Sequence, residues 1–233
     1  MPRDRDPRTD ARDLVIEVFP TARWALLTGS VLTALRTDGS DLDIVVVLPD
    51  GDPQAPQRIS RYYRDWPVEL FVHDEATLAH YLAKDVRARR PIMTRMLATG
   101  AAVLGDPGDW PYRCASALAA GPPPLTDVER AHVRYSLTDQ LDDLEHVVDP
   151  GERTAVVAAA WTAVAQEALA LAGHWTGHGK WLLRELRDLD PDFARRWVEA
   201  HGDAAIIAAL GREVLERNGG ALFAGYQVPG ERP

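Results

Sequence analysis

Two aspartates, Asp41 and Asp43, open a run of branched apolar residues, DLDIVVVL. In a β-strand the side chains at positions i and i+2 share a face, so the two carboxylates are expected side by side, with Leu42 and Ile44 turned into apolar packing. Adjacent carboxylates repel each other unless a cation lies between them, and Mg²⁺ takes carboxylate and phosphate oxygens. The pair therefore predicts a magnesium site that would also bind phosphate.

The preceding apolar run, WALLTGS, ends in Gly29 and Ser30, and ten residues separate Ser30 from Asp41. A glycine at a strand-to-helix turn lets the backbone approach a phosphate, and a hydroxyl with free amides at a helix start can bind it. We therefore predict that Gly29 and Ser30 bind the nucleotide. The plainer alternative is a turn glycine followed by a helix cap.

A third acid, Glu69, lies inside the apolar run PVELFVHD. A charged residue in such a run is costly to bury and usually has a function. Glu69 is the candidate for a further metal ligand, or for the base that takes the proton from an attacking hydroxyl. Two alternatives are a surface position on an edge strand and a salt bridge to a nearby arginine.

The elements that would position these residues alternate between helical periodicity and short apolar runs, which is typical of a sheet covered by helices. Strands are expected at residues 24–29, 42–48, 67–73 and 101–104. Helices are expected at residues 10–19, 30–36, 55–64, 74–86 and 91–99.

Residues 107–125 are rich in proline and glycine, so we predict a linker there between a catalytic domain, residues 1–106, and a helical domain, residues 126–233. In the second half, apolar residues recur at helical spacing. Helices are expected at residues 127–148, 153–173, 179–188, 192–200 and 203–217. The predicted fold class is α+β: a mixed sheet flanked by helices, followed by an all-α bundle.

Composition restricts the partners. The formal charge of −9, from 35 acidic and 26 basic residues, argues against duplex nucleic acid as substrate and favours a cationic one. One cysteine, Cys114, allows no internal disulfide and fits a reducing cytoplasm. The chain shows no signal peptide and no expected membrane span, so a soluble, cytoplasmic protein without a membrane partner is predicted.

The order Gly-Ser, ten residues, Asp-x-Asp and then an acid on a later strand resembles the DNA polymerase β-like nucleotidyltransferase superfamily over residues 24–73. SDLDIVVVLPD followed by VELFVHDEATL is similar to the bacterial aminoglycoside nucleotidyltransferases, which join this domain to a helical bundle. The resemblance implies transfer of AMP from ATP to an antibiotic hydroxyl. It also implies two Mg²⁺ ions held by Asp41, Asp43 and Glu69. Some family members are dimers with shared sites, which leaves a homodimer open.

In the helical half, no acceptor-binding residue transfers from the family. Lys180 and Arg184 lie four apart and could reach the triphosphate, or could form an ordinary solvated helix face. Asp139 could bind an ammonium group of the acceptor, or could simply be solvated. Glu167 interrupts an apolar helix and is a candidate substrate ligand or base, with an arginine of the bundle as its alternative partner.

Two rival functions stay open at this point. Short relatives of the superfamily act as antitoxins that attach AMP to a partner protein, although their helical partner is a separate chain. The other rival is a module that binds a nucleotide without catalysing a reaction.

Overall fold

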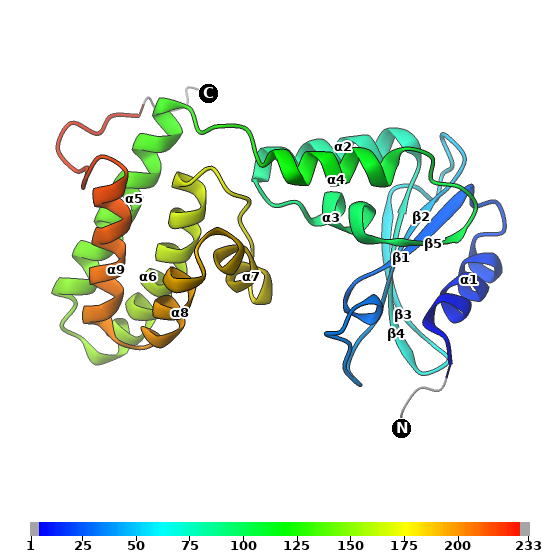
Figure 1. The fold of residues 1–233 in the computed structure, drawn as a ribbon, viewed down its shortest axis with the longest axis horizontal. Helices are drawn as coiled ribbons and strands as arrows, with labels where there is room; N and C mark the ends of the chain where they lie inside the picture. Colours follow the sequence, from blue (N-terminus) through cyan, green and yellow to red (C-terminus); the bar gives the residue numbers. More distant parts are fainter. Residues whose placement is uncertain (1–4, 229–233) are drawn as a thin grey trace. The chain divides into compact units, whose positions relative to one another are not determined.

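The computed structural model describes residues 5–228 of the 233-residue chain. The chain divides into two compact units, Met1–Ala120 and Gly121–Pro233. The first contains a mixed β-sheet with helices, and the second is built from helices (Figure 1). The α+β class predicted from the sequence is confirmed.

The sheet of the first unit has the strand order β3-β4-β2-β1-β5. Its strands are β1 (Trp24–Thr28), β2 (Leu42–Val47), β3 (Gln57–Tyr63), β4 (Trp66–His73) and β5 (Ala101–Leu104). The central strands β2 and β4 run parallel, whereas the other neighbouring pairs are antiparallel. The sheet is therefore mixed, as predicted, with the Asp-x-Asp strand at its centre.

Helices cover both faces of this sheet (Figure 1). Ile44 and Val46 face α1 (Pro7–Val18), whereas Val45 and Val47 face the layer of α2 (Glu75–Ala88), α3 (Ile92–Thr99) and α4 (Trp110–Ala120). Because side chains alternate along a strand, β2 needs apolar residues on both faces, which explains its unbroken IVVV run.

The prediction of a helix over residues 55–64 is wrong, because this segment forms β3, antiparallel to β4. The hairpin turn consists of Arg64 and Asp65, both at positive φ, 47° and 69°. Arg64 donates hydrogen bonds to Asp10 (2.7 Å) and Asp13 (2.8 Å) of α1. An Arg-Asp turn lacks the Asn-Gly signature of two-residue hairpins, so a hairpin is hard to predict from these residues.

Two further expectations need correction. The proline- and glycine-rich segment expected as a linker contains α4, which packs against α3 and buries Cys114. Proline is tolerated in the first turn of a helix, and Pro111 is the second residue of α4. The helix expected over residues 30–36 is reduced to one 3₁₀ turn, Ser30–Leu32.

The second unit contains α5 (Asp127–His146), α6 (Pro150–Leu171), α7 (Lys180–Leu189), α8 (Pro191–Glu199) and α9 (Ala204–Arg217). These bounds lie within three residues of the predicted ones. The spacing of Leu137, Leu141 and Leu144 places one face of α5 in the core, and all three are buried there with Val164 and Leu169 of α6.

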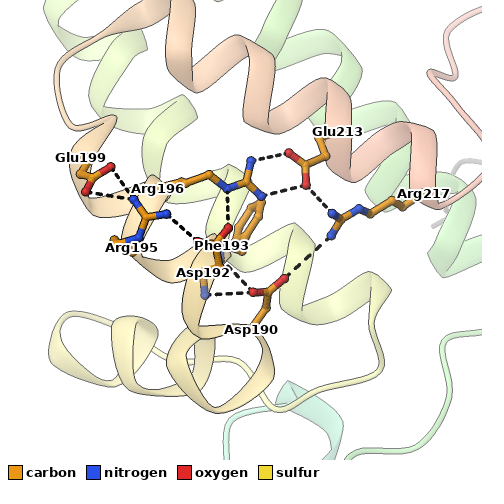
Figure 2. Close-up of polar contacts among 8 residues, drawn as sticks. All are labelled: Asp190, Asp192, Phe193, Arg195, Arg196, Glu199, Glu213 and Arg217. Atoms are coloured by element: carbon orange, nitrogen blue, oxygen red, sulfur yellow. Dashed lines mark hydrogen bonds and ion pairs between the residues drawn. The ribbon is translucent and has the colours of Figure 1, made fainter.

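Polar contacts fasten α8 to its neighbours. Trp161 of α6 and Trp197 of α8 stack at 3.9 Å, and each indole N–H donates to the other's backbone carbonyl, at 2.8 and 2.7 Å. Figure 2 shows the contacts of α8 with α9, where Arg196 donates two hydrogen bonds to Glu213, at 2.7 and 2.9 Å. Glu213 also pairs with Arg217, so its carboxylate joins two arginines.

Within the part of the chain that the structure describes, α6 alone is long and apolar enough to cross a membrane by length and composition. The sequence expectation of no such stretch is therefore too strict. Val164, Ala165 and Leu169 of α6 are nevertheless buried in the core of the helical unit, as in the central helix of a soluble bundle.

Candidate functional site

The carboxylates of Asp43 and Glu69 lie on the same face at one end of the sheet. Asp43 of β2 is paired in register with Glu69 of β4, and Thr28 of β1 is opposite Asp43 on the other side. Neighbouring strands lie about 4.8 Å apart, and registered residues project to the same face. Asp41 precedes Asp43 by two residues, next to the start of β2, and both are half-buried. The register thus brings Asp43 and Glu69 side by side, with Asp41 two residues before Asp43 along the chain.

Gly29 makes direct room for the Asp43 carboxylate. A Cβ atom added at Gly29 would lie 2.5 Å from Oδ2 of Asp43, closer than real Cβ contacts. Gly29 also has φ 89° and ψ −170°, a conformation that is essentially restricted to glycine. The backbone conformation therefore favours glycine here, and a side chain at this position would also displace the Asp43 carboxylate. The Gly29–Ser30 turn therefore lies directly against Asp43 of the Asp-x-Asp strand.

Ser30 is tied to the residue that precedes Asp41. The hydroxyl oxygens of Ser30 and Ser40 lie 3.0 Å apart, and Oγ of Ser40 accepts a hydrogen bond from the Thr37 amide at 2.9 Å. This contact closes the connection between β1 and β2 into a loop. Because Ser30 begins a single 3₁₀ turn, the expected row of amides at a helix start is missing here. Any phosphate contact of Ser30 would come from its hydroxyl and local backbone.

Glu69 has a partner that the sequence left open. Nη2 of Arg58, on the outer strand β3, lies 2.5 Å from Oε2 of Glu69. The Arg58 guanidinium also lies over the Phe71 ring, 4.8 Å from its centroid. Since β4 lies between β3 and β2, Glu69 is not on an edge strand. Of the alternatives drawn from the sequence, the salt bridge to a nearby arginine is present.

The donor set fits a hard divalent cation that is shared with phosphate. Among residues 5–228, no three or more His, Cys, Asp or Glu side chains are gathered closely enough to hold a metal ion on their own. Mg²⁺ commonly uses one or two carboxylates and completes its octahedron with substrate phosphates and water. Asp41 and Asp43 match that requirement. The metal-ligand role of Glu69 stays a prediction.

The helical unit carries the remaining predicted residues. Lys180 is exposed at the start of α7, and the Arg184 guanidinium lies 4.6 Å from the Trp181 ring centroid. Asp139 is exposed on α5. These side chains belong to the second unit, and their contacts with nucleotide and acceptor stay predictions.

Glu167 differs from these surface groups. It lies on α6, one turn from the buried residues Ala163 and Leu171. In the described part of the chain it has no hydrogen-bond or ion-pair partner, so the arginine partner proposed as an alternative is not formed. Burial raises the pKa of this carboxyl to about 7. A carboxyl of this kind can bind a cationic ligand or exchange a proton near neutral pH.

Sequence reasoning missed Arg58 and Ser40. Arg58 was hidden by the helix expected over residues 55–64, because only a strand directs its side chain towards Glu69. The alternation around Ile59 in QRISRYY, with its tyrosines, was the available signal for a strand. The position of Ser40 directly before Asp41 was the available sign that it lies close to the predicted site.

No protein-family model matches the chain, and no curated protein matches it. Among solved structures, it is similar to the crystal structure of a nucleotidyltransferase-like protein from Exiguobacterium sibiricum 255-15. The TM-score is 0.48 and the sequence identity is 13%, over 91% of this chain and 75% of that chain.

Proposed function

We propose that the protein is a Mg²⁺-dependent nucleotidyltransferase that transfers AMP from ATP to a hydroxyl of a small cationic molecule of the aminoglycoside type. The observation that carries the proposal is the fit between Gly29 and Asp43. Gly29 has a backbone conformation essentially restricted to glycine, and a Cβ atom added there would lie 2.5 Å from the Asp43 carboxylate oxygen. Asp43 is itself registered with Glu69. Phosphate-binding backbone and acidic metal ligands are needed at the same point for nucleotidyl transfer.

In the proposed reaction, the acceptor oxygen forms a bond to the α-phosphorus of ATP. The bond from that phosphorus to the oxygen bridging to the β-phosphorus breaks, and pyrophosphate leaves. Asp41 and Asp43 would hold Mg²⁺, which when bound stabilises the charge that develops on the phosphate oxygens. Glu69, on the same face, is the candidate to accept the proton of the acceptor hydroxyl.

The helical unit would supply the acceptor site. Glu167 is a partly buried, unpaired carboxyl, and Asp139 is an exposed one. Both can attract ammonium groups, which agrees with the acidic balance of the chain. Lys180 and Arg184 would contact the triphosphate.

The experiment is pyrophosphate release from ATP and Mg²⁺ across aminoglycosides of the streptomycin, spectinomycin and kanamycin types. Asp43→Asn should lose nearly all turnover because it removes a metal-binding charge at nearly constant volume. Asp38→Asn is the matched control, since Asp38 is an exposed acid of the same β1–β2 connection. It should retain turnover.

Each other outcome has a distinct meaning. Equal turnover in Asp43→Asn and wild type would refute the assignment. No pyrophosphate release with any of these drugs, together with transfer of AMP to one host protein, would favour the protein-modifying rival. Binding of ATP without pyrophosphate release under any condition would favour the inactive module.

A further inference from the structure

Arg58 is placed to control Glu69. It reaches across from the outer strand β3 and contacts one oxygen, Oε2, of the Glu69 carboxylate at 2.5 Å. The Arg58 side chain is 61% exposed, whereas that of Glu69 is 30% exposed. The more exposed arginine therefore contacts a less exposed carboxylate, and its guanidinium packs over the Phe71 ring.

This contact affects the acidic end of the sheet as a whole. Glu69 is registered with Asp43, which follows Asp41 by two residues, and Arg58 supplies one positive charge beside Glu69. A guanidinium and a divalent cation both bind carboxylate oxygens, so they compete for Oε2 of Glu69. When Arg58 holds Glu69, Asp41 and Asp43 are the two carboxylates that would bind Mg²⁺.

We infer that Arg58 is a positioning residue: it holds the Glu69 carboxylate beside Asp43 and keeps it from capturing the metal. The inference rests on the proposed function. It assigns Arg58 no contact with the reacting atoms. Its effect on turnover is expected to pass entirely through Glu69.

The chain provides a matched control on the same strand. Arg61 is exposed, carries the same charge and is opposite Val68, so it projects from the face of the sheet opposite to Glu69. Arg61→Gln removes the same charge from β3 without touching Glu69. Loss of an exposed ion pair changes stability little, so both arginine variants should fold.

The first measurement is Mn²⁺ binding to the nucleotide-free protein by titration calorimetry. Arg58→Gln should bind Mn²⁺ several-fold more tightly than wild type, because Glu69 becomes free to join the aspartates. The gain should vanish in the double variant Arg58→Gln/Glu69→Gln and be small in Arg61→Gln. Equal gains in Arg58→Gln and Arg61→Gln, a gain that persists in the double variant, or no Mn²⁺ binding at all would overturn the inference.

The second measurement is turnover in the same set. Arg58→Gln and Glu69→Gln should lower kcat with little change in the KM for ATP, and the double variant should be no slower than Glu69→Gln. Arg58→Lys should recover part of the loss. Additive losses, or full activity in Arg58→Gln, would overturn the inference while leaving the proposed function intact. If Arg58→Gln shows the expected Glu69-dependent gain in Mn²⁺ affinity but the wild-type protein transfers no nucleotide, the proposed function alone would be refuted.

Discussion

Replacement of Gly29 by alanine tests whether the turn and the Asp43 carboxylate form one site. The new Cβ would lie 2.5 Å from Oδ2 of Asp43, and ordinary contact begins at 3.4 Å. The carboxylate oxygen must therefore move by roughly 0.9 Å. A misplacement of about 1 Å in a catalytic constellation can lower a rate about 100-fold. We expect a loss in kcat of that order in Gly29→Ala.

The same substitution also has a backbone cost, which a second glycine measures separately. Alanine in the conformation of Gly29 should destabilise the first unit by about 1–3 kcal/mol. Gly51 has φ 75°, and a Cβ added there would meet nothing within 4 Å. Gly51→Ala should therefore cost about 1–2 kcal/mol through its backbone alone and leave turnover unchanged.

Urea unfolding gives the free energy of unfolding of both variants, and pyrophosphate release gives kcat at a temperature where both are folded. The reasoning predicts similar destabilisation in the two variants and a large kcat loss only in Gly29→Ala. Full activity in Gly29→Ala would refute it, as would an equal kcat loss in Gly51→Ala.

Three further predictions concern groups away from the aspartates. His73 is buried with an unpartnered Nδ1, and burial lowers its pKa from 6.5. The unfolded chain therefore takes up a proton more readily, so stability should fall as pH falls below about 6.5. His73→Phe should flatten this loss of stability between pH 7 and pH 5, whereas the exposed control His80→Gln should not. Burial raises the pKa of Glu167 to about 7, so ionisation of this carboxyl opposes folding as pH rises from 4.5. Glu167→Gln should therefore stabilise the protein by at most about 3 kcal/mol at pH 8 and little at pH 5. Equal urea midpoints for wild type and Glu167→Gln at pH 8 would contradict this. Glu213→Gln weakens the contact between α8 and α9 in Figure 2 and should lower the free energy of unfolding by about 1–2 kcal/mol. The exposed control Glu199→Gln should lower it by less than about 0.5 kcal/mol. Similar losses in the two variants would show that the Glu213 contact adds no more stability than a surface ion pair.

The sequence predicted most of the helical unit and the central strands for a physical reason. Leu137, Leu141 and Leu144 recur at helical spacing, and Leu42 to Val47 form a branched apolar run, so local pattern and final burial agree. β3 was missed because its stability comes from pairing with β4 and from a turn whose Arg64 is held by Asp10 and Asp13 of α1. Such long-range contacts leave little trace in a local window.

The same distinction applies to the site. Strand periodicity, which is a local property, predicts a common face for Asp41 and Asp43. The pairing of Glu69 with Asp43, and of Arg58 with Glu69, depends on strand order and register. The clearance between Gly29 and Asp43 depends on the path of two separate strands and could not be derived from spacing alone.

The most direct test of the central claim follows the phosphorus atoms of ATP. Purified protein, Mg²⁺ and an acceptor aminoglycoside are incubated with ATP labelled at either the α- or the γ-phosphate, in parallel with Asp43→Asn. Nucleotidyl transfer predicts that the α label enters the acceptor, that the γ label leaves in pyrophosphate, and that both events disappear without Mg²⁺ or with the variant. Appearance of the γ label in the acceptor, or transfer that persists in Asp43→Asn, would contradict the account.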